Sequence, residues 1–395
     1  MPSPLTEVIL DRIRTRGPMT VAEYMGLALY HPAHGYYTSA PRRSGGSGDF
    51  FTSVDLGGLF GELLFVQLAE MAEVVLRGDG AALAANAGRP SFDLVEAAAG
   101  NGRLSRDILD AAARIDPLFL ESVQLYLVEA SAAARDQQRE VLGTHVGRLR
   151  GSGPGLPAAV HGVVLANELL DALPPHLVVV RRGSLREVFV GAEGGRLCSV
   201  EGPPSTPRLA QYLDDVGARL EEGWFAEINL AAYDWVVEAA DRLARGFLLL
   251  IDYGHPASQL YSATHAQGTL TSFRAHASES REAGPGWLRD PGLRDLTSHV
   301  DLTGVRRAAE GAGLKTLGML DQGYFLMSLG LEERLSGDSG QAEQKLGPTP
   351  AALRRRLALK TLLLPGGLGS THKVMIFGKG VGTPALRGTA FKRLT

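Results

Sequence analysis

Four short apolar runs, each ending in a polar residue, constrain the fold of this 395-residue chain more than any other feature. The runs cover residues 92–96, 125–129, 163–167 and 247–252. Helical stretches accompany them: residues 104–113 carry apolar residues at helical spacing, 132–142 form a polar helix, and a third helix lies around 233–245. Strands that are apolar throughout and alternate with helices are typical of a parallel sheet covered on both faces. The sequence therefore predicts an α/β fold with a doubly wound sheet.

The polar residues that end these runs predict a binding site. They are Glu96, Glu129, Asn167 and Asp252. In an open parallel sheet the carboxyl ends of the strands share one edge, and ligands bind in the crevice outside it. We therefore expect these four side chains to converge at that edge.

The remaining segments divide around this core. We expect a helical segment with a glycine-rich middle at 1–75, a binding core at 91–255 and a C-terminal part at 300–395 that completes the sheet. The core contains a hairpin near 186–200 that turns at Gly194 and Gly195. A polar insertion at 256–299 lies on the substrate side, since such irregular segments commonly carry specificity.

Smaller features complete the division of the chain. The C-terminal part shows a helix at 305–311, an extended segment at 317–329 and a terminal strand at 372–378. Stretches rich in Gly, Ala or Pro are expected to be loops or boundaries. They are residues 77–90, 151–157 and 337–350.

Composition excludes several classes of protein. A net charge of −3 gives no reason to expect a nucleic-acid partner. The single cysteine, Cys198, excludes internal disulfides and fits a reducing compartment. No segment reaches the roughly 18 apolar residues of a membrane span, and the first 16 residues lack the apolar stretch of a signal peptide. We therefore expect a cytoplasmic protein with no membrane partner.

The strongest local motif is Glu96-Ala97-Ala98-Ala99-Gly100-Asn101-Gly102, between a strand and a helix. Its small residues allow close approach of a ligand to the backbone. As a dinucleotide fingerprint it fails, because Ala98 replaces the first glycine. The motif is either a tight turn without a ligand or a site for a phosphate-free ligand such as S-adenosylmethionine (SAM).

Glu129 closes the second strand, where an acidic residue can accept hydrogen bonds from both hydroxyls of a ribose. The alternative is a cap on the following helix, which Ser131 can provide equally well.

A third motif, at residues 166–174, places an amide and two carboxylates at the end of the third strand. Glu168 and Asp171 are suited to orient a cationic methyl acceptor, and a guanidinium would be bound bidentately and lose its proton to them. The alternative is helix capping, with Asn167 as the cap and the two carboxylates in the first turn.

The fourth motif is Asp252-Tyr253-Gly254-His255, and His276, His299 and Asp301 follow it. These residues lack the close spacing of metal ligands, because no H-x-x-x-H or H-x-H pair is present. We therefore expect no metal ion. A histidine here is either a hydrogen-bonded structural residue or a general base.

Together these motifs resemble the MidA-like SAM-dependent methyltransferases, whose mitochondrial members are complex I assembly factors that methylate an arginine of a partner subunit. The resemblance spans nearly the whole chain. Besides the four motifs, it rests on ordered blocks at 18–25, 30–37, 48–53, 60–62, 268–270, 295–301 and 364–369.

The resemblance implies a class I, Rossmann-like methyltransferase fold with SAM as cofactor. It implies that the block at 48–53 folds over SAM as a lid and that the hydroxyls of Thr52 and Ser53 bind the methionine carboxylate. The expected cofactor-binding residues are Gly48, Phe51, Thr52, Ser53, Glu96, Ala98, Gly100, Gly102, Glu129 and Asn167. The expected catalytic residues are Asn167, Glu168, Asp171, Asp252 and His255.

The chain departs from the family pattern at two places. Ala97, Ala98 and Ala99 replace Leu-Gly-Pro, and residues 54–57 replace Pro-Glu-Ile-Ser. At Ala98 a methyl group is added where the backbone needs an unusual φ or a close approach to the ligand.

The expected function is SAM-dependent methyl transfer, an activity of the EC 2.1.1 class, to an arginine of a protein partner. A small-molecule O- or N-methyltransferase and a degenerate SAM-binding assembly chaperone are the alternatives. An NAD-dependent oxidoreductase is also compatible with the fold, but the broken fingerprint disfavours it. The oligomeric state and the number of methyl groups transferred are left open.

Overall fold

The computed structural model describes residues 3–39, 58–78, 91–274, 277–278, 285–336 and 368–391. The chain forms two compact units, each assembled from three segments. The α/β unit comprises Thr52–Asn167, Glu238–Asp252 and Ala312–Thr395. The antiparallel unit comprises Met1–Phe51, Glu168–Val237 and Tyr253–Gly311. The chain thus leaves one unit for the other directly after Asn167 and directly after Asp252.

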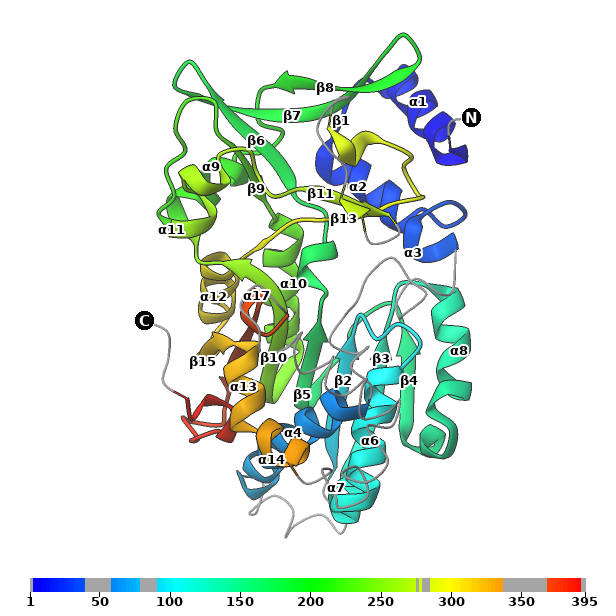
Figure 1. Cartoon of the computed structure of the whole chain (residues 1–395), viewed down its shortest axis with the longest axis vertical. Helices are drawn as coiled ribbons and strands as arrows, with labels where there is room; N and C mark the ends of the chain where they lie inside the picture. The colour runs from blue at the N-terminus through cyan, green and yellow to red at the C-terminus, as the bar shows by residue number, and fades with distance from the viewer. Residues whose placement is uncertain are drawn as a thin grey trace, which may run out of the picture. The chain divides into compact units, whose positions relative to one another are not determined.

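The α/β unit is built on a mixed sheet (Figure 1). Its strands lie in the order β15 (Lys315–Asp321), β16 (His372–Lys379), β10 (Leu243–His255), β5 (Val160–Asn167), β2 (Phe92–Ala97), β3 (Val123–Val128) and β4 (Leu149–Gly153). Strand β2 pairs in parallel with both β3 and β5, while β15 and β16 pair antiparallel. The order of the chain reverses at β2, which confirms a doubly wound, Rossmann-like α/β fold.

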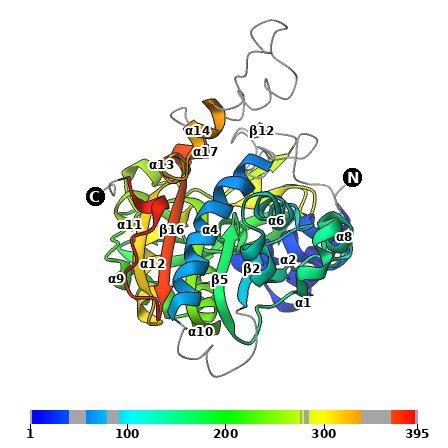
Figure 2. The same ribbon diagram turned by 90° about the horizontal axis from the view of Figure 1, so that it is seen from below.

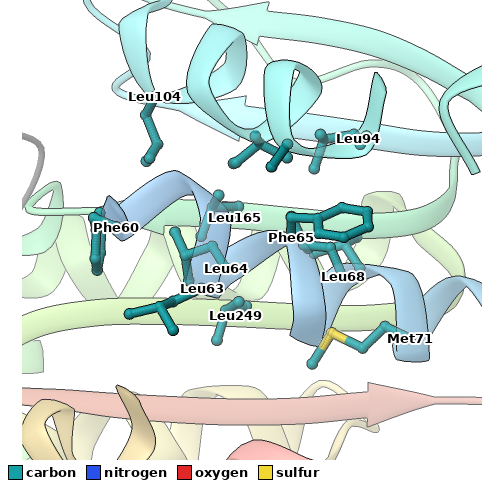
Figure 3. Packing of buried hydrophobic residues seen from close by; sticks show 14 of the residues in the cluster. Phe60, Leu63, Leu64, Phe65, Leu68, Met71, Leu94, Leu104, Leu165 and Leu249 are labelled. Carbon is teal, nitrogen blue, oxygen red and sulfur yellow. The ribbon is translucent and has the colours of Figure 1, made fainter. Parts of the chain in front are cut away.

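Helices bury the apolar strands of this sheet. They include α4 (Gly58–Gly78), α6 (Arg103–Ile115), α7 (Pro117–Ser122), α8 (Ala132–Leu142), α10 (Leu230–Arg242), α13 (Gln322–Ser328), α14 (Leu331–Ser336) and α17 (Leu368–Thr371), with 3-10 turns η2 (Gly143–Arg148) and η6 (Arg387–Thr389). Helix α4 runs along the strands (Figure 2). Its side chains Leu63 and Leu64 pack with Leu165 of β5 and Leu249 of β10 (Figure 3), and each buried leucine contributes about 1.5–3 kcal/mol.

The antiparallel unit is built on a second sheet. Its strands follow the order β1 (Met19–Thr20), β7 (Ser184–Glu193), β6 (His176–Arg181) and β9 (Phe225–Ile228), and β8 (Arg196–Gly202) pairs with β7. Alternate residues of β6 face opposite cores. Leu177 and Val179 pack with α1 (Pro4–Arg16) and α2 (Val21–Tyr30), whereas Val178 packs with α9 (Arg208–Val216) and α11 (Ala257–Leu260).

Short elements complete the antiparallel unit. A three-stranded sheet has the order β12 (Ala277–Ser278), β11 (Thr271–Arg274) and β13 (Asp295–Thr297). Strand β14 (Val300–Asp301) pairs in parallel with Gly254 and His255 of β10. The remaining elements are α3 (Tyr36–Ser39), η3 (Leu170–Ala172), η4 (Ala263–His265), η5 (Gly286–Leu288) and α12 (Leu302–Gly311).

Most predicted elements are present, and two predictions were wrong. The segment 317–329 is not extended throughout, because β15 ends at Asp321 and α13 follows it. Phe325 and Leu326 are buried one helical turn after the buried Gln322. Buried residues three to four positions apart are typical of a helix, and this spacing decides the structure here although aromatic residues favour strands. The stretch 151–157 is not wholly a loop, because its first residues belong to the edge strand β4, which lacks a continuous apolar run.

The compact units also group the chain differently from the four-part division made from sequence. The hairpin near 186–200 turns at Gly194 and Gly195 as predicted, but it pairs with β1 and β6 in the antiparallel sheet. The division of the chain into a lid segment, a binding core, a substrate-side insertion and a C-terminal part, with boundaries at residues 75, 91, 255 and 299, stays a prediction. The stretch 337–350 lies outside the described residues. Among the helices of the described ranges, none combines the length and apolar character needed to cross a bilayer.

Candidate functional site

The carboxyl edge of the α/β sheet brings four predicted residues together. The pairing register aligns Ala97 of β2 with Val128 of β3 and with Ala166 of β5. Glu96, Glu129 and Asn167 therefore lie at three adjacent strand ends. Ile251 of β10 pairs with Asn167, so Asp252 stands at the same level of the sheet, although β10 itself continues to His255. This edge flanks the point where the strand order reverses, which is where ligands of doubly wound sheets bind.

Glu129 joins the end of β3 to the small-residue loop. Its Oε2 accepts the Gly100 N–H at 2.8 Å, and its Oε1 accepts the Ser131 N–H at 2.7 Å. Ser131 caps α8 by accepting the Ala134 N–H at 3.3 Å, so the capping alternative for Glu129 is not needed. Each carboxylate oxygen has a further lone pair that could accept a ribose hydroxyl.

The small-residue loop adopts left-handed backbone at three positions. Ala98, Gly100 and Gly102 have φ values of 56°, 50° and 83°. At Gly102 an added Cβ would lie 3.0 Å from Cδ1 of Leu127, a tight contact, and the left-handed backbone itself favours glycine there. Ala98 tolerates its conformation at a cost of about 1–2 kcal/mol. The expectation of an unusual φ at Ala98 is confirmed.

Glu96 is buried, and it caps α6 from the preceding strand. Its Oε2 accepts the Ser105 N–H at 3.1 Å and also contacts the Ser105 hydroxyl. Gly102, which stands at the N-cap of α6, has no side chain to do this. Burial raises the pKa of Glu96 to about 8, although the Ser105 hydrogen bonds oppose that rise. Glu96 therefore supports the loop, and its contact with SAM stays a prediction.

Asn167 presents a buried acceptor at the end of β5. Among the described residues no donor reaches its Oδ1, although the atom is shielded from solvent. An unsatisfied buried acceptor costs about 1–3 kcal/mol, so such an atom suits a ligand donor. The four expected cofactor contacts Gly48, Phe51, Thr52 and Ser53 lie outside the described residues.

The antiparallel unit holds Asp171 in a polar cluster of its own. Oδ2 of Asp171 accepts the Tyr253 hydroxyl at 2.6 Å and the Thr297 hydroxyl at 2.8 Å. The Asp171 side chain is 8% exposed. Its backbone is fixed because Ser298 donates its N–H to the Asp171 carbonyl at 3.3 Å. The strand β13 and the turn η3 thus position this carboxylate.

A second carboxylate extends this cluster. The Tyr37 hydroxyl donates to Asp295 Oδ1 at 2.9 Å and lies 3.1 Å from Oδ2. Burial, with Asp295 as the next cause, raises the pKa of Tyr37 well above its usual value, and Asp171 is close enough to add to the effect. We call Tyr37, Asp171, Tyr253, Asp295 and Thr297 the acid–tyrosine cluster. Buried carboxylates beside aromatic rings are suited to a cation.

Glu168 is the first residue of the segment Glu168–Val237 of the antiparallel unit, and its backbone is strained. Its φ is 53°, which is uncommon for a residue with a side chain. Strained residues of this kind gather at functional sites, where the surrounding structure holds them. The catalytic roles of Asn167, Glu168, Asp171, Asp252 and His255 stay predictions.

Sequence reasoning missed several members of these sites. Tyr37, Asp295 and Thr297 lie in blocks that carried the family resemblance, but nothing in the blocks assigned them a role. The structure also brings together His255, His265 and His299, whose ligand atoms lie within 4.8 Å of one another. His265 belonged to none of the sequence motifs, and the lack of close spacing gave no sign that the three histidines meet. His276 lies outside the described residues.

Known proteins resemble this chain over most of its length. Residues 81–320 match a family model for S-adenosyl-L-methionine-dependent methyltransferases. The mouse mitochondrial protein arginine methyltransferase NDUFAF7 is 29% identical over 87% of this chain and 80% of its own length. Its Caenorhabditis elegans homolog is 30% identical over 84% of this chain and 77% of its own length.

A solved structure resembles the whole chain. It is a COG1565 superfamily member from Burkholderia thailandensis bound to S-adenosyl-homocysteine, with a TM-score of 0.83 and 28% identity over 99% of this chain and 97% of its own. The relatives from mouse and C. elegans are named as mitochondrial proteins. That finding overturns the cytoplasmic location expected from the sequence.

Proposed function

The chain belongs to the family of SAM-dependent methyltransferases, and we propose that its methyl acceptor is an arginine side chain of a protein partner. The acid–tyrosine cluster carries this proposal. It offers two buried carboxylates, Asp171 and Asp295, which accept hydrogen bonds from the hydroxyls of Tyr37, Tyr253 and Thr297. The names of the relatives from mouse and C. elegans, which are protein arginine methyltransferases, support the same acceptor.

We assign the cofactor to the edge of the α/β sheet. Glu129 would accept the ribose hydroxyls, and the loop from Ala98 to Gly102 would lie against the cofactor. Asn167 Oδ1, which has no donor among the described residues, would accept one from the ligand. SAM supplies a methyl group on a sulfonium that is already activated as a leaving group. The protein therefore has to position and desolvate the reacting groups rather than activate the donor.

Toward the acceptor, the protein has a different task, which is to remove a proton. A guanidinium is protonated at all ordinary pH values, so its nitrogen must lose a proton as the methyl group is transferred. Asp171 would accept a guanidinium N–H and take up the released proton, and Glu168 would complete a bidentate pair. The Tyr253 and Thr297 hydroxyls hold Oδ2 of Asp171, which fixes the direction of its other oxygen. Asp252 and His255 are the further catalytic candidates.

Label transfer tests the acceptor. The purified full-length protein would be incubated with methyl-labelled SAM and a lysate of its source organism from which the gene has been deleted. The labelled protein would then be hydrolysed and its amino acids separated. We expect the label in methylarginine. Label in another amino acid or in small molecules would overturn the arginine assignment, and absence of any transfer would favour a non-catalytic chaperone.

Variants connect this activity to the cluster. Asp171→Asn keeps the shape of the side chain but removes the negative charge, so we expect transfer to fall about 100-fold, within the range attributed to general bases. Binding of S-adenosyl-homocysteine, measured by calorimetry, should stay within twofold. Asp234→Asn is the matched control, since Asp234 is an exposed partner of Arg208 in the same unit. Equal transfer by Asp171→Asn and Asp234→Asn would refute the role of Asp171.

A further inference from the structure

Three histidines from separate segments of the antiparallel unit lie side by side. The ring centroid of His255 is 4.8 Å from that of His265 and 5.1 Å from that of His299, and the last two are 5.9 Å apart. One nitrogen of each ring lies within 4.8 Å of the others, and all three residues are half-buried. In sequence they are separated by 10 and 34 residues, so folding alone unites them.

The backbone fixes where these histidines stand. His255 belongs to β10 and pairs with Asp301, while His299 directly precedes β14 on the neighbouring strand. His265 ends the turn η4, and the next carbonyl, that of Ala266, accepts the Phe225 N–H at 2.9 Å. Hydrogen bonds of this kind hold the backbone of these segments before any ligand binds, which lowers the entropic cost of forming a site.

A buried carboxylate strengthens this arrangement. Glu227 accepts the N–H groups of Thr269 and Leu270, each at 2.9 Å, and thereby holds the loop that follows His265. The Thr269 hydroxyl in turn accepts the His299 N–H at 3.0 Å. The positions of His265 and His299 are thus linked through a single short network.

The ring nitrogens have the hydrogen bonding expected of ligands. His265 donates Nδ1–H to the Gln259 carbonyl at 2.9 Å, which leaves Nε2 as the nitrogen that could bind a metal. In a metal-bound histidine, the ring nitrogen that does not bind the metal usually donates its N–H to a backbone carbonyl, a carboxylate or water. Nδ1 of His299 is buried and has no hydrogen-bond partner among the described residues.

We propose that His255, His265 and His299 bind a zinc ion, with the remaining coordination position left to water. Neutral imidazole is a preferred zinc ligand, and three histidines with one open position form an established zinc geometry. Zinc–nitrogen bonds of about 2.0–2.1 Å require nitrogens about 3.3 Å apart, so ring rotations must shorten the present separations by at most about 1.5 Å. This site goes beyond the proposed function and does not depend on it.

The position of the site suggests its effect. The ring of His299 contacts that of Tyr253 edge-on, with centroids 5.7 Å apart, and Tyr253 donates to Asp171. A zinc ion would therefore tie together the segments around residues 255, 265 and 299 directly behind the acid–tyrosine cluster. We expect it to order this region and to raise the thermal stability of the whole protein.

Metal binding can be measured on the full-length protein, purified without a polyhistidine tag and treated with a chelator. Zn²⁺ would be titrated by calorimetry against a competing chelator, and Co²⁺ would be titrated by visible absorption. We expect one Zn²⁺ per chain, intense Co²⁺ bands typical of four-coordinate nitrogen ligation, and a rise in Tm of about 5 °C with saturating Zn²⁺.

Variants separate this site from adventitious binding. His265→Ala and His299→Ala should each weaken Zn²⁺ binding about 100-fold and remove the intense Co²⁺ bands. His265→Gln provides the test if His299→Ala does not fold, because it keeps a polar side chain at a half-exposed turn. His34→Ala is the matched control, since it removes one ring of the separate His31–His34 stack in the same unit. Equal affinity in wild type and His265→Ala, or no binding in wild type, would overturn the proposal.

Discussion

The two candidate sites are held together in different ways. At the edge of the α/β sheet, Glu129 reaches Gly100 and Ser131, and the contacts lie on the backbone of neighbouring loops. In the acid–tyrosine cluster, side chains separated by 82 to 258 positions meet: Tyr253 with Asp171, and Tyr37 with Asp295. The first site depends on local turns, and the second depends on the packing of the whole antiparallel unit. A substitution in one turn should therefore weaken binding at the first site only in part. A substitution that disturbs the packing of the antiparallel unit should disrupt the second site entirely.

The largest effect is expected where packing is tightest. In Gly254→Ala the new Cβ would lie 2.1 Å from the Val300 carbonyl oxygen, which would force β10 and β14 apart. We expect a loss of about 3 kcal/mol or more in the free energy of unfolding, measured by urea denaturation.

A helical glycine in the same unit provides the control for Gly254. At Gly26 of α2 the nearest atom to a new Cβ is Cγ of Pro174 at 3.9 Å, an ordinary contact. Gly26→Ala should stabilise by about 0.5–1 kcal/mol, because alanine favours the helix. If both variants lost stability equally, close strand approach would not explain the glycine at position 254.

The next effect concerns the first site. Glu129→Ala removes both carboxylate oxygens, so the Gly100 N–H and the expected ribose hydroxyls lose their acceptor. We expect the affinity for S-adenosyl-homocysteine to fall about 100-fold, or about 2.7 kcal/mol, in calorimetry. Glu140→Ala removes an exposed carboxylate from α8 and should leave the affinity unchanged. If Glu129→Ala bound S-adenosyl-homocysteine as tightly as wild type does, Glu129 would not be the residue that binds the ribose.

The difference between the sites also explains how far the sequence could predict them. The apolar runs that end at Glu96, Glu129, Asn167 and Asp252 are visible in the sequence, and parallel pairing of the strands then brings these residues to one edge of the sheet. The pairing of Asp171 with Tyr253 and Thr297, and the meeting of His255 with His299, depend on how the antiparallel unit folds. No spacing rule reports contacts between residues so far apart. The helix α13 was missed for a smaller reason, since its seven residues give too short a period to identify reliably.

Burial of Glu96 predicts a pH-dependent stability. Its pKa in the folded protein, about 8, exceeds its unfolded value of 4.5, so the folded state holds its proton more tightly. The resulting stabilisation is complete below about pH 4.5 and is lost as the pH rises through 8. Between these values the slope should reach at most about 1.4 kcal/mol per pH unit.

Glu96→Gln tests this dependence. The amide oxygen can still accept the Ser105 N–H and cap α6, but it does not titrate. Urea unfolding at pH 5, 6.5 and 8 should therefore show a flatter profile for the variant than for wild type. Glu140→Gln, an exposed carboxylate, should keep the wild-type profile. Parallel profiles for Glu96→Gln and wild type would show that Glu96 does not hold its proton.

The smallest effect is expected at the alanine that departs from the family pattern. Ala98 has a φ of 56° and is exposed, so its methyl group adds strain without adding packing. Ala98→Gly should relieve about 1–2 kcal/mol of strain and lose about half of that gain to the greater freedom of glycine in the unfolded chain. We expect a net stabilisation of about 0.5–1 kcal/mol in urea unfolding. Ala99→Gly, at a buried position outside the left-handed region, should instead destabilise the protein. A loss of stability in both variants would mean that the backbone around Ala98 is not strained, and the local character of the first site would then have to be revised.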